Sequence, residues 1–297
     1  MSRMRITYLD TAKALLIILV VLGHILIVVN PNYENVYISL IQSFIYVFHM
    51  PAFFIIHGIL INDEKYKKMS IIEFIKQRFY TLIIPYLFFE VLGIIFRYVL
   101  YKQSINVGLF NLLTARCNIG ADWFLIALFM GSFYYLLACK YLNQHIRIIL
   151  LMVSFIIPIF SNGSQFLIVF GKSLIAYGFV EIGKKKKKQI VNTNIFNFCF
   201  SLFITILISI LNLKFGANDL YSCTISNPIN LVLGGIAGSQ LLIYISKIID
   251  YKLMNYIGKN SLIIMGTHQL IIYFCTSFFG SLNTLLVGLI IVLLTIP

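Results

Sequence analysis

Charged residues are scarce in this chain: they make up 11% of its 297 residues, against about 25% in an ordinary soluble domain. Hydrophobic residues make up 60%, and the mean hydropathy is +0.93. A soluble core cannot bury this much apolar surface, so the composition excludes a soluble globular protein. The apolar residues form continuous runs rather than alternating with polar ones. This pattern excludes a transmembrane β-barrel and indicates an all-α, polytopic membrane helical bundle.

The motifs of several common sites are also missing. The five cysteines have no CxxC spacing and no metal-ligand pattern, so we expect packing cysteines and no metal site. The chain has no glycine-rich phosphate loop and no G-x-S-x-G nucleophile turn. The first apolar run, 14–29, is too long for a cleavable signal peptide, so we expect it to remain as a membrane helix.

The apolar runs have the length of membrane-spanning helices, about 17–25 residues. We predict a single integral membrane domain, 1–297, with about ten spans, at roughly 12–29, 37–61, 79–100, 121–139, 147–161, 165–182, 195–213, 228–246, 261–279 and 281–296. The charged segment 63–78 predicts a short amphipathic helix on the inner membrane surface.

Positive charges fall mostly on alternate loops. With a cytoplasmic N-terminus, 17 Lys and Arg residues lie in cytoplasmic segments and 3 lie in outer loops. Because cytoplasmic loops carry an excess of Lys and Arg, we predict this orientation. The distribution also explains the net charge of +13 without nucleic acid as a partner. The run Lys184–Lys188 is expected to anchor the topology on anionic membrane lipids, with attraction of an anionic substrate as the alternative.

Two ionisable residues lie inside the first apolar run, in the stretch DTAKALLIILVVLGH at 10–24. A helix turns about 100° and rises about 1.5 Å per residue, so Lys13 and His24 share one face, about 16 Å apart along the axis. An ionisable residue at membrane depth indicates a functional site. Two interpretations stay open. Either Lys13 and His24 belong to a site, or Asp10 and Lys13 form an interfacial ion pair and His24 is a core histidine.

Further ionisable residues fall inside other apolar runs: His49 and His57 in the second, Glu90 in the third and His268 in the ninth. Such groups are costly in hydrocarbon, so together they predict a polar interior cavity that crosses the membrane. His49 is a candidate catalytic residue. Its alternative role is structural, as a hydrogen-bond donor to a backbone carbonyl near Pro51.

Two carboxylates need an explanation of their own. Glu90 is expected to be buried and to need a partner, for which a histidine or Arg97 is available. Asp122 begins the fourth apolar run and precedes Trp123. We expect Asp122 to cap that helix at the membrane interface.

The chain resembles the acyltransferase 3 family in five segments that follow in the family's order. The first is YLDTAKALLIILVVLGH at 8–24, where the family has an arginine, ten residues and then a histidine. Lys13 stands at the arginine position and His24 at the histidine position, a version that resembles the fucose 4-O-acetylase-like branch. The other segments are FHMPAFFIIHG at 48–58, RFYTLIIPY at 78–86, WFLIALF at 123–129 and IGKNSLIIMGTHQL at 257–270. His57 stands where the family usually has a serine.

The resemblance implies a multi-pass O-acyltransferase of the bacterial plasma membrane. It implies an acyl-CoA donor, expected to be acetyl-CoA, on the cytoplasmic side and a cell-surface glycan, or its lipid-linked precursor, as acceptor. Removal of the hydroxyl proton requires a base, and we assign this role to His24, with His268 and His49 as further catalytic residues. Lys13 is expected to hold donor phosphates. Arg78 is a second candidate for the donor, or an anchor of the third helix.

Two other classes of protein remain as alternatives. In a secondary transporter, the intramembrane His, Glu and Lys residues would form a proton relay. Inverted repeats with paired broken helices, which are expected of such transporters, are not visible in the sequence. A lipid-binding scaffold would leave the shared face of Lys13 and His24 unexplained.

Overall fold

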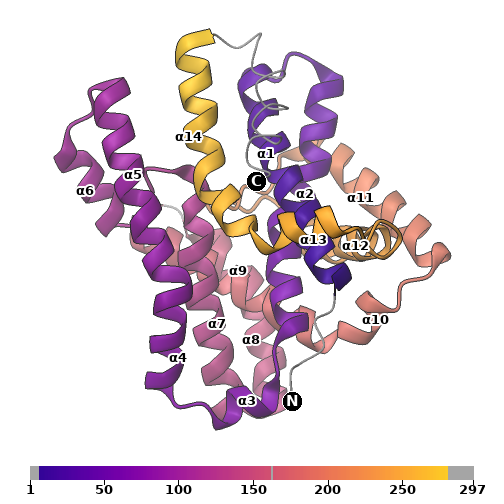
Figure 1. Cartoon of the computed structure of the whole chain (residues 1–297). Helices are drawn as coiled ribbons and strands as arrows, with labels where there is room; N and C mark the ends of the chain where they lie inside the picture. The colour runs from indigo at the N-terminus through magenta and orange to yellow at the C-terminus, as the bar shows by residue number, and fades with distance from the viewer. Residues whose placement is uncertain (1–6, 162, 280–297) are drawn as a thin grey trace. The chain divides into compact units, whose positions relative to one another are not determined.

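The computed structural model describes residues 7–161 and 163–279, and the regular elements in this part of the chain are all helical (Figure 1). One isolated β-bridge joins Asp219 and Thr224. The α-helices are α1 (Thr7–Val29), α2 (Val36–Leu60), α3 (Asp63–Lys68), α4 (Ile71–Arg78), α5 (Ile84–Tyr101), α6 (Ile105–Leu113), α7 (Trp123–Tyr141), α8 (Gln144–Ile156), α9 (Gln165–Lys185), α10 (Lys187–Val191), α11 (Ile195–Phe215), α12 (Pro228–Ile248), α13 (Lys252–Lys259) and α14 (Ser261–Phe279). The predicted all-α fold is confirmed.

Seven helical segments in the described residues are long and apolar enough to cross a membrane, so the chain is a multi-pass membrane protein. They are Thr7–Val29, Val36–Leu60, Ile71–Tyr101, Gly120–Tyr141, Gln165–Lys185, Ile195–Phe215 and Pro228–Ile248. Two shorter apolar helices, Gln144–Phe160 and Ser261–Ser277, coincide with the predicted spans 147–161 and 261–279. The tenth predicted span, 281–296, lies outside the described residues. The predicted count of about ten spans is therefore not confirmed.

The prediction of one surface helix over 63–78 is wrong. The chain forms α3, breaks at Met69 and starts again as α4, because Asn62 and Ser70 each cap a helix through their side-chain oxygens. A π-helical turn at Phe79–Ile83 then joins α4 to α5 without a break. The membrane-spanning helix therefore begins within the charged segment, at Ile71, and runs on to Tyr101 (Figure 1).

The described chain divides into two compact units. Unit 1 contains α1, the first part of α2 up to Phe53, and the segments 188–216 and 230–279. Within it, α1 packs against α13 and α14. The contact with α13 is close: a Cβ added to Gly258 would lie 1.8 Å from the carbonyl oxygen of Asp10. The expectation of a single domain over 1–297 stays a prediction.

Unit 2 contains residues 54–187 and the loop segment 217–229. Its centre is α9, which packs against α7 and α8 (Figure 1). The last part of α2 also contacts α9 through two glycines. A Cβ added to Gly58 would lie 2.1 Å from the carbonyl oxygen of Val180, and one added to Gly183 would lie 2.2 Å from that of Ile55. The two backbones approach this closely only because both positions lack a side chain.

Candidate active site

Three histidines from three helices gather in unit 1. The rings of His24 on α1 and His268 on α14 have centroids 5.1 Å apart, with 44° between their planes. His49 on α2 lies within electrostatic range of His24. Tyr46 contacts both helices: its ring centroid is 4.7 Å from that of His49, and a Cβ added to Gly23, which precedes His24 on α1, would lie 2.9 Å from its Cε2. The structure thus brings together the three residues that the sequence suggested for catalysis.

Two of these rings have a defined proton arrangement. Nδ1 of His49 lies 2.9 Å from the carbonyl oxygen of Ile45, and Nδ1 of His268 lies 2.9 Å from that of Ile264. A carbonyl oxygen only accepts hydrogen bonds, so each Nδ1 carries a hydrogen. In the neutral ring, Nε2 then holds a lone pair. Nε2 of His268 is buried and has no hydrogen-bond partner among the described residues, so it can accept a proton.

Gln269 is the residue of this cluster that sequence reasoning missed. Its amide Nε2 lies 3.2 Å from Nδ1 and 3.4 Å from Nε2 of His24. The amide either donates to a ring nitrogen or, rotated by half a turn, accepts a hydrogen from one. In the second arrangement the other nitrogen of His24 keeps its lone pair. The sequence feature that could have identified Gln269 is a polar amide side chain inside an apolar run, next to His268.

Lys13 lies on the same unbroken helix as His24, because α1 runs from Thr7 to Val29. Its Nζ forms an ion pair with Asp10, at 2.7 Å, and its side chain is 26% exposed. The predicted ion pair is therefore present. It leaves room for a second anionic partner, because the ammonium has three donors and is partly exposed.

Unit 1 also holds a carboxylate beside the start of α1. Asp250 accepts hydrogen bonds from the hydroxyls of Thr7 and Thr11 and from the side-chain amide of Asn255. These bonds, that from Thr7 first, hold the pKa of the exposed Asp250 carboxyl below its ordinary value. The interaction ties the start of α1 to the segment that leads into α13.

Arg78 belongs to unit 2, and its partners there are now defined. It donates to the hydroxyl of Tyr66 at 2.6 Å and lies 3.5 Å from Nε2 of His57. The same Nε2 of His57 lies 3.1 Å from the hydroxyl of Ser132. The guanidinium also lies over the ring of Phe74, 5.7 Å from its centroid. These contacts tie α4 to α2, α3 and α7, and they serve folding whether or not Arg78 contacts a donor.

Glu90 is fully buried and is satisfied by amide donors rather than by a histidine. Its carboxylate accepts hydrogen bonds from the backbone and side chain of Asn118 and from the backbone of Ile119. Arg97 donates instead to the carbonyl oxygen of Asn118 at 2.7 Å. Glu90 therefore fixes the turn that leads into α7.

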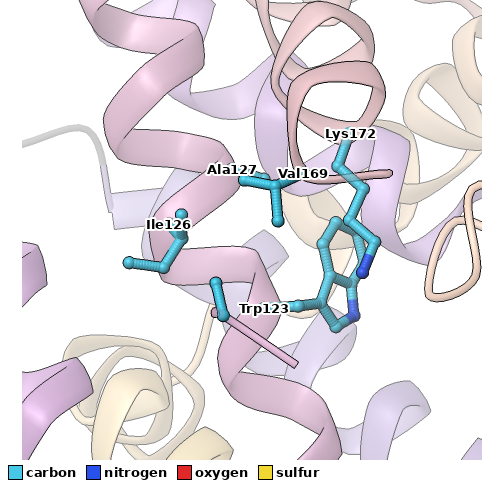
Figure 2. Close-up of a pocket in the computed structure, with 6 residues that line it drawn as sticks. Trp123, Ile126, Ala127, Val169 and Lys172 are labelled. Atoms are coloured by element: carbon cyan, nitrogen blue, oxygen red, sulfur yellow. The ribbon is translucent and has the colours of Figure 1, made fainter. Parts of the chain in front are cut away.

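A small cavity of about 10 Å³ lies between α7 and α9 in unit 2 (Figure 2). Figure 2 shows the side chains of Trp123 and Lys172 side by side at this cavity. Asp122 immediately precedes Trp123, and the cap predicted for it is wrong: its side chain makes no capping hydrogen bond to α7.

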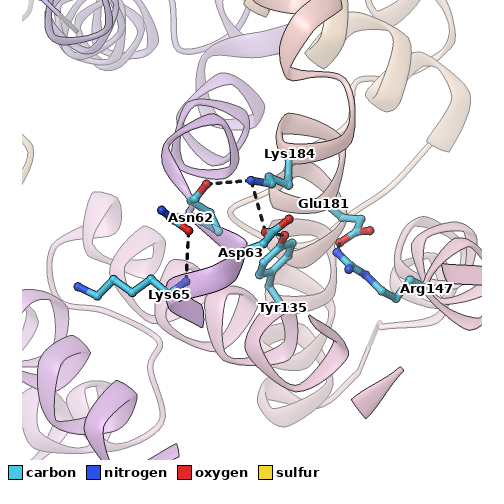
Figure 3. Close-up of polar contacts among 8 residues, drawn as sticks. Asn62, Asp63, Lys65, Tyr135, Arg147, Glu181 and Lys184 are labelled. Atoms are coloured by element: carbon cyan, nitrogen blue, oxygen red, sulfur yellow. Dashed lines mark hydrogen bonds and ion pairs between the residues drawn. The ribbon is translucent and has the colours of Figure 1, made fainter. Parts of the chain in front are cut away.

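A chain of polar contacts joins α3, α7, α8 and α9 in unit 2 (Figure 3). The hydroxyl of Tyr135 donates to Asp63 at 2.7 Å, and Nζ of Lys184 lies 3.4 Å from the same carboxylate. Arg147 pairs with the fully buried Glu181 at 2.6 Å. Lys184 therefore holds the end of α9 to α3 in addition to the topological role predicted for its lysine run.

A family model described as "Acyltransferase domain" matches residues 6–297. The chain is similar to a curated protein, the nodulation protein NolL of Sinorhizobium fredii, to which it is 35% identical over 131 residues. The matched part is 42% of this chain and 34% of NolL, so the chain spans about a third of the length of that relative. No solved structure matches.

Proposed function

The chain belongs to the acyltransferase 3 family, whose domain covers residues 6–297, and on this premise we propose that it is a membrane O-acyltransferase. It moves an acyl group, expected to be acetyl, from acyl-CoA on the cytoplasmic side to a hydroxyl of a cell-surface glycan or its lipid-linked precursor. The observation that carries the proposal is the gathering of His24, His49 and His268 in unit 1 of a chain of this family. The resemblance also implies a location in the bacterial plasma membrane, where a transfer from a cytoplasmic donor to a cell-surface glycan would take place.

In the proposed reaction, His24 removes the proton of the acceptor hydroxyl while that oxygen bonds to the carbonyl carbon of the donor. The carbon–sulfur bond breaks as the carbon–oxygen bond forms. The proton on His24 then passes to the leaving thiolate, so protons and electrons balance. Gln269 supports this role when its amide oxygen accepts the N–H of His24, because the other ring nitrogen then faces the acceptor with its lone pair.

His268 and His49 support the base in the same proposal. Both rings hold a lone pair on Nε2. The ring of His268, 5.1 Å from that of His24, is placed to share the positive charge that develops on His24. We expect His268→Ala and His49→Ala to reduce turnover less than His24→Ala does.

Donor binding is assigned to Lys13, with Arg78 as the second candidate. The partly exposed ammonium of Lys13 suits a phosphate oxygen, since lysine binds phosphate as a point charge. A donor thioester supplies an activated carbonyl group. The partners of Arg78 within unit 2 favour its structural role.

The test is mass spectrometry of surface glycans from cells with and without the protein. We expect an ester on the glycan that disappears in the deletion strain and returns with the wild-type gene. His24→Ala should lower transfer by about 10²- to 10⁴-fold, the usual contribution of a general base, while the protein remains inserted and folded. His145→Ala is the matched control, because His145 lies exposed at the start of α8. Normal transfer by His24→Ala would show that His24 is a packing residue rather than the base. Sugar uptake without a new ester would indicate a transporter.

A further inference from the structure

The histidine cluster of unit 1 supplies a base for acyl transfer, but no group in it has yet been assigned to the carbonyl oxygen of the acyl group. Besides removal of the hydroxyl proton, the reaction needs a hydrogen-bond donor at this oxygen, because negative charge develops there in the transition state. Such a donor must lie near the base and must be accessible to the substrate. The cluster consists of His24, His49, His268, Gln269 and Tyr46.

Three of these side chains are engaged within the protein. Nδ1 of His49 and Nδ1 of His268 donate to backbone carbonyl oxygens, which leaves a lone pair on each Nε2. The amide of Gln269 is bonded to the ring of His24. In the proposed reaction, His24 receives a proton rather than donating to the carbonyl oxygen. Of the five residues in the cluster, Tyr46 is therefore the one whose hydroxyl can serve as the donor.

Exposure points to the same residue. His24 and Tyr46 are partly exposed, whereas His49, His268 and Gln269 are each at most 6% exposed. A substrate can contact only groups that reach the surface of the cluster. His24 and Tyr46 are therefore the two residues of the cluster that can touch the reacting atoms, and the three buried side chains act through their neighbours.

The phenol of Tyr46 lies against the helix that carries the base. A Cβ added to Gly23 would lie 2.9 Å from Cε2 of Tyr46 and 3.7 Å from its Cζ, the atom that bears the hydroxyl. Gly23 directly precedes His24 on α1, so the lack of a side chain at Gly23 allows this approach. The ring of His49 packs against the same phenol, with centroids 4.7 Å apart and 69° between the planes. These contacts fix the ring, and stabilisation of a developing charge requires such a preorganised donor.

We propose that Tyr46 is a catalytic residue whose hydroxyl donates a hydrogen bond to the carbonyl oxygen of acyl-CoA while His24 removes the proton of the acceptor hydroxyl. The proposal rests on the proposed function for the identity of the reaction. Tyr46 keeps its hydrogen throughout: the hydrogen bond strengthens as charge develops on the carbonyl oxygen and weakens again when the carbon–sulfur bond breaks. A neutral phenol suits this position, because a cation at membrane depth is costly.

The test removes the hydroxyl of Tyr46 and keeps its ring. The full-length protein is purified in detergent, and kcat and KM are measured with acetyl-CoA and base-treated surface polysaccharide of the source strain. The variants are Tyr46→Phe and the matched control Tyr244→Phe. Tyr244 is a partly exposed tyrosine on α12 of the same unit, and its ring packs against Phe198 with centroids 4.8 Å apart. A third protein carries 3-fluorotyrosine at position 46, which keeps the hydroxyl and makes it a stronger hydrogen-bond donor.

We expect Tyr46→Phe to lower kcat by about 10²- to 10³-fold, the usual contribution of one donor to a developing oxyanion. KM for both substrates should stay unchanged, because the hydrogen bond reaches its full strength only in the transition state. Tyr244→Phe should keep the kcat of the wild type. If Tyr46→Phe does not fold, the fluorinated protein decides, because its kcat should exceed that of the wild type at a pH where the phenol stays protonated.

A folded Tyr46→Phe with the kcat of the wild type, or with a loss confined to KM, overturns the role of Tyr46 and leaves the proposed function in place. So does a fluorinated protein that is no faster than the wild type when Tyr46→Phe does not fold. The proposed function fails separately, if the wild type forms no ester on the polysaccharide. Hydrolysis of acetyl-CoA then tests Tyr46, because attack by water develops the same charge on the carbonyl oxygen. Hydrolysis that is lost in Tyr46→Phe alone keeps the role of Tyr46, and equal hydrolysis by all the proteins, or none, removes it.

Discussion

Gln269 provides a sharp test of the histidine cluster, because its contact with His24 emerged only from the structure. Leucine at this position keeps a similar volume and removes the amide that lies 3.2 Å from Nδ1 of His24. A neutral hydrogen bond contributes about 0.5–1.5 kcal/mol, and 1.36 kcal/mol corresponds to a factor of ten in rate. We therefore expect Gln269→Leu to lower kcat about 2- to 12-fold. KM for donor and acceptor should stay unchanged, because the proposal gives the amide the task of positioning the base and assigns it no contact with either substrate.

A double-mutant cycle separates this positioning role from a general loss of packing. kcat is measured for the wild type, Gln269→Leu, His24→Ala and the double variant, with acetyl-CoA and isolated polysaccharide as substrates. The double variant should be no slower than His24→Ala, since no ring remains to be positioned. Gln240→Leu is the matched control: it removes another membrane amide of unit 1, bonded to Ser201 at 2.9 Å. Losses that multiply in the double variant would show that Gln269 acts independently of His24, and the positioning role would be abandoned.

Three further predictions concern other parts of the chain. Lys13→Arg should keep substantial activity, whereas Lys13→Ala should raise the donor KM more than it lowers turnover. If the double variant Asp10→Asn with Lys13→Ala recovers full transfer activity, Lys13 only neutralises Asp10 and does not bind the donor. The lowered pKa of Asp250 stabilises the fold above the unfolded-state pKa of about 4, and this stability is lost as pH falls through the lower folded-state pKa. The Tm advantage of the wild type over Asp250→Asn should therefore shrink between about pH 6 and about pH 3, and a constant advantage would contradict the assignment. In a cysteine-free background, an impermeant thiol reagent should label Asn218→Cys but not Lys186→Cys in intact cells, and the reverse pattern would invert the topology.

The long helices were predictable from the sequence, and the short ones were not. The run that forms α1 is set by apolar length, because hydrocarbon permits only backbone that satisfies its own hydrogen bonds. The short helix α13, with lysines at both ends, has no such signal. It depends on close packing between Gly258 and the carbonyl of Asp10, which no local pattern reveals. The break between α3 and α4 was missed because the cap at Ser70 was hidden within an otherwise continuous amphipathic pattern.

The candidate site shows the same division. Helical spacing placed Lys13 and His24 on one face, and the cost of an ionisable residue inside an apolar run added His49 and His268. Only the tertiary structure could show that His24 meets Gln269 rather than a carboxylate. The sequence also suggested an ordinary cap for Asp122, whereas its side chain is buried away from the helix amides. Sequence preferences give the position in which a residue type is usually found. They do not show whether its side chain finds a hydrogen-bond partner in the folded chain.

The glycine contact between α2 and α9 has a consequence for how the protein assembles in the membrane. Each helix is stable in lipid on its own, and lipid tails are as apolar as the helix surfaces, so burial of apolar surface gives little drive for association. Association of these helices depends instead on the backbone approach at Gly58 and Gly183. Alanine at either position would leave insertion and span hydropathy intact while it separates the inserted helices. Such a variant would accumulate with its helices correctly inserted in the membrane but not packed together. Membrane-integration assays would miss this defect, whereas increased protease sensitivity would reveal it.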